Sequence, residues 1–204
     1  MRLAAENMDI ARGDRLLVQG CSFVLEPGEA LAVTGPNGVG KSTLLRALAG
    51  FLPLARGRVT SDSGDGSGLA GQAHYLGHAN ALKGSLTALE NLEFWAALLR
   101  PAGAQARLDA GQALQALGLA HVANLPCAYL SAGQKRRVAL ARLLTAPRPL
   151  WLLDEPAAAL DAAAQAQLEA VIRNHRAGGG LVIAALHAPL DIGPVRELAL
   201  RGVP

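Results

Sequence analysis

Gly35-Pro36-Asn37-Gly38-Val39-Gly40-Lys41-Ser42-Thr43 is the stretch that decides the fold, because it has the G-x-x-x-x-G-K-[ST] spacing of a phosphate-binding P-loop. An apolar, strand-like segment (residues 30–34) precedes it, and a helix-forming segment (residues 44–49) follows it. Strand, loop and helix in this order form the context that the motif requires. The alternative, a glycine-rich turn that happens to precede Lys-Ser, is disfavoured by these flanks.

The residue types of this stretch suit a polyphosphate. Gly35, Gly38 and Gly40 allow the backbone to form a nest of N–H groups, because a Cβ would hinder the approach or the positive φ angles. The following helix presents unpaired N–H groups and the positive end of its dipole to the same anion. Lys41 adds a cation for the β- and γ-phosphates, and the Ser42 hydroxyl can ligate Mg²⁺.

Composition sets the limits of the fold. The chain has 204 residues, which predicts one large domain or one domain with an inserted subdomain. Hydrophobic residues make up 51% and charged residues 17%, which argues against disorder. Aromatic residues are only 3%, so the core must consist of Leu, Ala and Val. The net charge of +3 is too small to indicate a nucleic-acid partner.

The sequence shows no sign of export or of a membrane span. Cys21 and Cys127 are far apart and are predicted to be small buried hydrophobes rather than disulfide partners or metal ligands. No basic segment with an apolar run begins the sequence, so no signal peptide is expected. No stretch approaches the roughly 18 continuous apolar residues of a span. We therefore expect a soluble, cytoplasmic chain.

The order of predicted elements indicates an α/β fold with a mostly parallel, doubly covered sheet. Residues 2–10 and 15–25 have the alternation of an antiparallel strand pair. Thr87 and Glu90 fit a capping box that begins a helix, and residues 85–130 are predicted to be a helical insertion. The predicted apolar stripe of that helix consists of Leu89, Leu92, Phe94, Trp95, Leu98 and Leu99. The remaining predictions are strands over 58–60, 74–78, 150–155, 181–186 and 195–200, helices over 105–118, 135–146 and 162–176, and a loop over 61–72.

An apolar strand ends in two carboxylates, Asp154 and Glu155. A P-loop ATPase places a metal-linked Asp and its general base at this position. Asp154 would hold Mg²⁺ through water or Ser42, and Glu155 would face the attacking water. An acidic turn after a buried strand is the alternative, and the upstream P-loop disfavours it.

The segment Leu130-Ser131-Ala132-Gly133-Gln134 precedes another predicted helix. Ser131 is a good N-cap, and Gly133 would let a phosphate approach the helix N-terminus. One nucleotide cannot easily use two phosphate cradles on one subunit, so a head-to-tail dimer is predicted, in which each cradle closes on the partner's nucleotide. An ordinary capped helix is the alternative.

Together, GPNGVGKST, LSAGQ, LWLLDEP, AALD and a lone histidine after a buried strand resemble the nucleotide-binding subunits of ABC transporters over essentially the whole chain. The resemblance implies a P-loop NTPase fold with a mostly parallel core sheet, an antiparallel β subdomain and a helical subdomain inserted at about 85–146 of a single domain, 1–204. It also implies a sandwich dimer with two ATP sites and bound Mg²⁺.

Carried over by position, the resemblance assigns the site residues. Glu155 is the base, His187 the switch histidine at the γ-phosphate, and Lys41 a catalytic cation; without the resemblance, His187 would be a surface or capping residue. Ser42 and Asp154 hold the metal, Ser131 and Gly133 contact the γ-phosphate across the dimer, and Asp161 belongs to the D-loop between subunits. The expected nucleotide-binding residues are Gly35, Pro36, Asn37, Gly38, Val39, Gly40, Lys41, Ser42, Thr43, Arg12, His78, Ser131, Gly133, Gln134 and Asp161.

Three positions depart from the usual pattern. Ala132 replaces a glycine of the LSGGQ-type motif, which could loosen the contact across the dimer. The aromatic residue that usually stacks on adenine is absent, and the guanidinium plane of Arg12 is expected to stack there instead. His78 occupies the position of a glutamine that links Mg²⁺ to the membrane partner. A metal or haem site at His74 and His78 is disfavoured, since such histidines are usually unliganded.

With these departures, the sequence resembles one subfamily, the ATP-binding subunits of haem-exporter type in cytochrome c maturation. The matching segments are Tyr75–His78, Leu86–Leu92, LSAGQKRRVALARL and His187–Leu190. The resemblance implies an ATP-hydrolysing subunit that powers haem export or release of the haem chaperone during cytochrome c biogenesis. It also implies a homodimer docked on integral membrane subunits at the cytoplasmic face of the bacterial inner membrane, with no nucleic acid. Another ABC importer or exporter subunit is the alternative, followed by a soluble ABC ATPase acting on nucleic acid or ribosomes and by a module that holds ATP without cleaving it.

Overall fold

The computed structural model describes residues 1–62, 68–99 and 108–202. The chain divides into two compact units. The first, here called the core unit, comprises Met1–Gly77, Pro149–Pro156 and Ile172–Pro204. The second, the helical unit, comprises His78–Arg148 and Ala157–Val171. No helix in the described ranges is long and apolar enough to cross a membrane.

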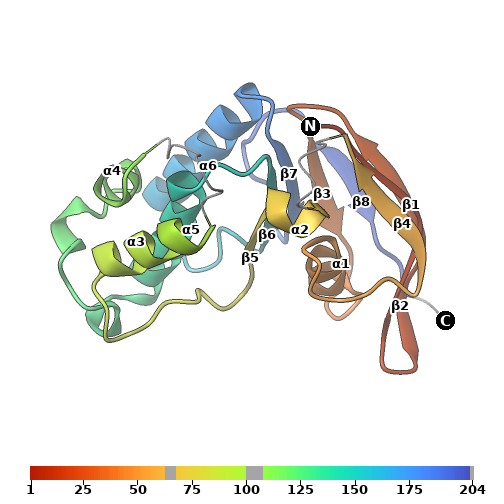
Figure 1. The fold of residues 1–204 in the computed structure, drawn as a ribbon, viewed down its shortest axis with the longest axis horizontal. Coiled ribbons are helices and arrows are strands. Elements are labelled where there is room, and N and C mark those ends of the chain that lie inside the picture. The colour runs from red at the N-terminus through yellow and green to blue at the C-terminus, as the bar shows by residue number, and fades with distance from the viewer. Residues whose placement is uncertain (63–67, 100–107, 203–204) are drawn as a thin grey trace. The chain divides into compact units, whose positions relative to one another are not determined.

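A parallel sheet of five strands forms the centre of the core unit, in the order β5-β6-β7-β3-β8 (Figure 1). Every neighbouring pair in it is parallel, as predicted. Each residue of β6 and β7 is buried, because strands covered on both faces require continuous apolar runs. The strands are β3 (Ala30–Thr34), β5 (Ala73–Leu76), β6 (Leu150–Asp154), β7 (Leu181–Ala185) and β8 (Arg196–Ala199).

An antiparallel sheet with the order β2-β1-β4 completes the core unit (Figure 1). Its strands are β1 (Leu3–Arg12), β2 (Arg15–Leu25) and β4 (Arg56–Ser61), which confirms the predicted strand pair. The register of β1 shifts around Asn7, which has φ 47° and whose N–H donates to Ser22 Oγ. Across from this irregularity a Cβ on Gly57 would lie 2.4 Å from the Asn7 carbonyl oxygen, so only glycine fits there.

Helices belong to both units. Helix α1 (Lys41–Leu48) packs against β6 and β7 in the core unit, where Leu44, Leu152 and Ile183 are fully buried. The remaining helices are α2 (Gly68–Gln72), α3 (Ala88–Leu99), α4 (Ala110–Ala116), α5 (Ala132–Thr145) and α6 (Ala162–Ala177), with 3₁₀ turns at Ala120–Val122 and Cys127–Tyr129. Cys21 and Cys127 are buried, as predicted, and desolvation raises the pKa of the Cys21 thiol to about 11.

Several sequence predictions of local structure were wrong. The predicted loop over 61–72 ends in α2, while residues 63–67 lie outside the described ranges. The helix predicted from residue 135 begins at Ala132, because the cap at Ser131 supports three further residues. Of the helix predicted over 105–118, residues 105–107 lie outside the described ranges, and the helix observed in the rest is α4, Ala110–Ala116.

The apolar stripe predicted on α3 is also partly wrong. Leu92 is fully buried, but Phe94 and Leu98 are 55% and 61% exposed. The helix instead buries Ala88, Asn91, Leu92 and Ala96, and the amide of Asn91 donates to the carbonyls of Lys83, Leu86 and Thr87. A polar residue therefore belongs to the buried face. The predicted capping box is confirmed, since Thr87 N donates to Glu90 Oε2 and Glu90 N donates to Thr87 Oγ1.

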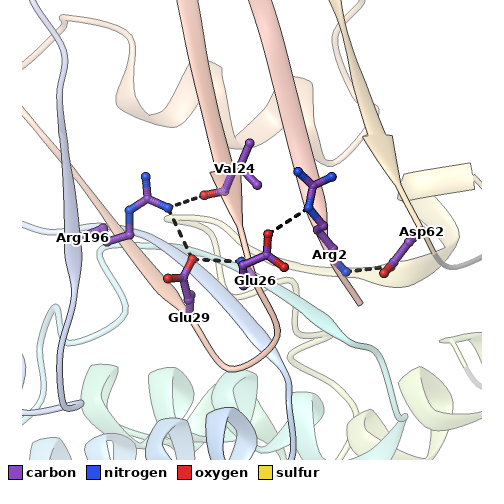
Figure 2. Close-up of polar contacts among 6 residues, drawn as sticks. All are labelled: Arg2, Val24, Glu26, Glu29, Asp62 and Arg196. Atoms are coloured by element: carbon purple, nitrogen blue, oxygen red, sulfur yellow. Dashed lines mark hydrogen bonds and ion pairs between the residues drawn. The ribbon is translucent and has the colours of Figure 1, made fainter.

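A group of polar contacts joins the strands at the start of β3 (Figure 2). Arg196 donates to the carbonyl oxygen of Val24 and lies 3.4 Å from Glu29 Oε2. Glu29 accepts the N–H of Glu26 at 2.9 Å, and Arg2 Nε donates to Glu26 Oε1 at 2.9 Å. These contacts link β8 to the end of β2 and to the turn between β2 and β3, and they link that turn to Arg2, directly before β1.

Glu29 in this group gives a pH-dependent prediction. The N–H of Glu26, and secondarily Arg196, lowers the pKa of the Glu29 carboxyl below its usual 4.5. A carboxyl whose pKa is lower in the folded state than in the unfolded state stabilises the fold at pH values above its unfolded-state pKa. This contribution to the free energy of unfolding is lost as the pH falls through the folded-state pKa. Glu29→Gln should therefore lower the free energy of unfolding at pH 7, with a smaller difference at pH 3, in urea titrations. The control is Glu6→Gln, which alters a surface ion pair with Arg58. If the free energy of unfolding of both variants changed with pH in the same way, the stabilising role of Glu29 would be contradicted.

Candidate functional site

The P-loop joins β3 to α1 through a backbone that only glycine adopts easily. Gly35, Gly38 and Gly40 have φ angles of 133°, 78° and 115°. A Cβ on Gly35 would lie 2.6 Å from the carbonyl oxygen of Leu200, so packing also excludes any side chain at this position. At Gly38 a Cβ would meet nothing within 4 Å, and only the positive φ favours glycine.

Gly40 is the N-cap of α1, with no side-chain cap hydrogen bond. The first N–H groups of a helix have no partner within it, so this end of α1 is suited to an anion. Lys41 follows directly and is 7% exposed. Its Nζ donates to the carbonyl oxygens of Gly35 at 2.7 Å and Pro36 at 3.1 Å. These two hydrogen bonds hold the ammonium group against the backbone of the P-loop.

The acidic pair and the histidine lie at the same edge of the sheet as the P-loop. Strand β7 lies between β6 and β3, with Asp154 paired to Ala185 and Ala185 paired to Val33. Gly35 lies two residues beyond Val33, Glu155 one residue beyond Asp154, and His187 two residues beyond Ala185. Because carboxyl ends of parallel strands meet at one edge, the fold brings together segments that are far apart in sequence.

Glu155 is held in an unusual conformation. Its φ is 48°, which is uncommon for a residue with a side chain, and its N–H donates to the Ala185 carbonyl oxygen at 3.1 Å. Glu155 Oε1 lies 2.8 Å from His187 Nε2. Both side chains are partly exposed, Glu155 by 36% and His187 by 49%. The carboxylate is therefore oriented by a histidine and accessible to a reactant.

The donors at this edge fit Mg²⁺. Asp154 is 5% exposed at the end of β6, and Ser42 lies in the first turn of α1. A carboxylate and a hydroxyl are hard oxygen donors, and Mg²⁺ is commonly bound by one or two protein oxygens together with substrate phosphates. Within the described ranges, no group of three or more His, Cys, Asp and Glu side chains could hold a metal alone. The donor set thus suits a metal that arrives with a nucleotide.

Ser131 begins α5 in the helical unit with a complete capping box. The N–H of Gln134 donates to Ser131 Oγ at 3.2 Å, and the N–H of Ser131 donates to Gln134 Oε1 at 2.9 Å. Gln134 therefore has a structural use that the sequence prediction did not include. A Cβ on Gly133 would lie 2.9 Å from the carbonyl oxygen of Ala159, so close packing also requires this glycine.

The other predicted residues have different surroundings. Asp161 N-caps α6, because the N–H of Ala164 donates to its Oδ1 at 2.8 Å. His78 is exposed in the helical unit, and Arg12 is exposed at the end of β1. The structure thus assembles the P-loop, Asp154, Glu155 and His187 within the core unit, whereas Ser131, Gly133, Gln134 and Asp161 belong to the helical unit.

Comparison with known proteins shows the family of the chain. The family model for ABC transporters matches residues 18–158. The cytochrome c biogenesis ATP-binding export protein CcmA of Nitrobacter hamburgensis is 50% identical over 99% of both chains, and the protein of the same name from Rhizobium etli is 47% identical over 99% of this chain and 95% of its own.

Solved structures have the same fold. A putative ABC transporter ATP-binding protein from Pyrococcus furiosus superposes with a TM-score of 0.81 at 20% identity, covering 98% of both chains. A dimeric ATP-binding cassette bound to ADP and Pi in a post-hydrolysis state has a TM-score of 0.77 at 25% identity, with 91% and 88% coverage.

Fold and site together define an ATP-binding, transport-coupled ATPase of the ABC type. The chain belongs to the ABC transporter family, and within it to the CcmA proteins, which confirms the recognition, fold and function predicted from sequence.

Proposed function

We propose that this chain is the ATP-hydrolysing subunit of a membrane complex that powers haem export, or release of the haem chaperone, during cytochrome c biogenesis. It acts as a homodimer docked on integral membrane subunits at the cytoplasmic face of the bacterial inner membrane, with residues 1–204 as one ATP-binding domain. The 50% identity to CcmA proteins supports the process. The juxtaposition of the P-loop with Glu155 and His187 supports the chemistry.

In this mechanism, the P-loop amides and Lys41 bind the β- and γ-phosphates. Glu155 accepts a proton from the water that attacks the γ-phosphate, and His187 keeps the Glu155 carboxylate in position. Ser42 and Asp154 would hold Mg²⁺, which would supply positive charge to the phosphate oxygens. Ser131 and Gly133 of a second copy close over the γ-phosphate, so that hydrolysis removes the group that holds the copies together.

A mixing experiment tests the shared site. Lys41→Ala disables a P-loop, whereas Ser131→Asp keeps a good N-cap but adds negative charge against the γ-phosphate. Neither variant alone should hydrolyse ATP. Heterodimers formed by mixing them have one site with an intact P-loop and an intact Ser131, so ATPase activity should reappear. Mixtures that stay inactive although heterodimers form would contradict a site shared between copies.

The control for charge is Ser131→Asn, which is also a good N-cap but is neutral. It should retain more activity than Ser131→Asp. The membrane partners are tested separately, by solubilising membranes and identifying the integral proteins that co-purify with the chain. Recovery of ribosomes or DNA in place of membrane subunits would overturn the proposed process.

A further inference from the structure

The connection from β7 to β8, here called the crossover, consists of residues 186–195. Both strands are parallel to β3, which lies between them, so the chain must return along the sheet before β8 begins (Figure 1). Such a return usually takes about a dozen or more residues and contains a helix. The crossover lies entirely within the described ranges, and none of its residues belongs to a helix. Its backbone carbonyl groups therefore need partners other than those of regular secondary structure.

Two arginines near the end of α6 donate to these carbonyl groups. Arg176 donates through Nη1 to the carbonyl oxygen of Ile192 and through Nη2 to that of Pro194 at 2.7 Å. Arg173 donates to the carbonyl oxygen of Asp191, and its Nη1 lies 3.3 Å from the carboxylate of the same residue. A guanidinium group carries several donors in fixed directions, so it can hold neighbouring carbonyl groups in one arrangement.

Arg176 also joins the crossover to the turn that enters β3. Its Nε donates to the carbonyl oxygen of Gly28 at 2.9 Å. A Cβ on Gly28 would lie 3.1 Å from the Arg176 carbonyl oxygen, so this turn packs directly on the end of α6. One side chain thus connects three segments of the core unit, namely the end of α6, the turn before β3 and the crossover.

The part of the crossover that the arginines hold lies only a few residues beyond His187. Before the histidine, the N–H of Leu186 donates to the carbonyl oxygen of Val33 at 3.4 Å, which is long for a hydrogen bond. After it, Leu190 is buried against the core unit. The exposed stretch between these two points is residues 187–189. The weak contact before His187 leaves its position dependent on the segment that follows.

This short stretch transmits position well, because Pro189 restricts the backbone of the residue before it to extended conformations. Beyond it, the N–H of Ile192 donates to the carbonyl oxygen of Leu190 at 3.0 Å, so these two residues are held together. Ile192 is 2% exposed, and its own carbonyl oxygen is the one that α6 holds. A shift of Ile192 should therefore move His187, whose Nε2 lies 2.8 Å from Glu155 Oε1.

We propose that Arg176, assisted by Arg173, is a positioning residue for ATP hydrolysis, because it fixes the crossover that keeps His187 within hydrogen-bond distance of Glu155. This inference rests on the proposed function, in which His187 orients the Glu155 carboxylate. The arginines act through the histidine and not on the nucleotide. Arg176 contacts the turn at the start of β3, whereas the P-loop follows the other end of that strand. Loss of Arg176 should therefore slow turnover without weakening ATP binding.

A double-mutant cycle with His187 separates positioning from a general effect on the fold. Arg176→Ala should lower kcat by about tenfold, less than the ~10²-fold that a misplacement of about 1 Å can cost, with ATP affinity unchanged. In the His187→Ala background, the same substitution should cause no further loss, because the side chain through which it acts is gone. Single-turnover hydrolysis measures the low rates in that background. The control is Arg58→Ala, which breaks a surface ion pair with Glu6 and should leave kcat unchanged.

Two further variants keep the test decisive if Arg176→Ala does not fold. Arg176→Lys retains a cation but cannot reach three carbonyl groups in the same geometry, so it should show part of the loss. Arg173→Ala removes only the contacts to Asp191 and should show a smaller loss, again absent in the His187→Ala background.

Thermal melting without nucleotide sets an assay temperature at which every variant is folded. Wild-type kcat in Arg176→Ala would overturn the proposal, as would an equal loss of kcat with and without His187. Where Arg176→Ala does not fold, the same two outcomes for Arg176→Lys and Arg173→Ala would overturn it. Wild-type kcat in His187→Ala alone would instead overturn the role that the proposed function gives to His187.

Discussion

Replacing Glu155 by glutamine is expected to lower steady-state ATP hydrolysis by about 10²–10⁴-fold while ATP binding persists. Glutamine keeps the shape of the side chain but cannot accept a proton from the attacking water. The backbone of residue 155 is held by the hydrogen bond from its N–H to Ala185, which the substitution does not touch. The variant should therefore keep ATP bound and trap the proposed dimer, measured as a shift in size-exclusion chromatography that requires ATP.

Two comparisons make this result specific. His187→Ala removes the side chain that lies 2.8 Å from Glu155 Oε1, so activity should fall while Glu155 is still present. Glu93→Gln changes an exposed carboxylate on α3 and should leave hydrolysis by the isolated protein unaltered. Hydrolysis at the wild-type rate by Glu155→Gln would remove Glu155 from the role of general base.

The parts of the site that sequence predicts well are those encoded in short, contiguous segments. Each of these segments lies at or directly after the end of a strand, which fixes its position. They are the P-loop with its glycines and Lys41, and the pair Asp154-Glu155. The cap at Ser131 is equally local, since its partner Gln134 is three residues away. Local backbone geometry therefore suffices to predict them.

Contacts between distant segments could not be predicted in this way. Glu155 and His187 are 32 residues apart, and their contact depends on β6 and β7 being neighbours in the sheet. The ring of His175 stacks on Trp151 at 3.8 Å between centroids, which no periodicity indicates. The approach of Val18 on β2 to Gly40 of the P-loop likewise depends on the folded arrangement of segments that are distant in sequence.

The misplaced apolar stripe on α3 has a related cause. Periodicity counts hydrophobic residues, so it included Phe94 and Leu98 and left out Asn91. Asn91 is 2% exposed because its amide satisfies three carbonyl groups at the turn that enters α3. Hydrogen bonding at a helix start can thus rotate the buried face away from the one that hydrophobicity alone predicts.

Replacing Lys41 by alanine is expected to weaken ATP binding by about 100-fold or more, because hydrogen bonds from a buried cation to phosphate are among the strongest in proteins. The fold should survive, since the carbonyls of Gly35 and Pro36 that Lys41 contacts belong to a partly exposed loop. Arg46→Ala, which removes an exposed cation from the last turn of the same helix, is the matched control and should bind ATP normally. The measurement is titration with a fluorescent ATP analogue, alongside thermal melting without nucleotide. If Lys41→Ala binds as tightly as Arg46→Ala, the loop over residues 35–43 is not the phosphate site, and Glu155 cannot have the role proposed for it.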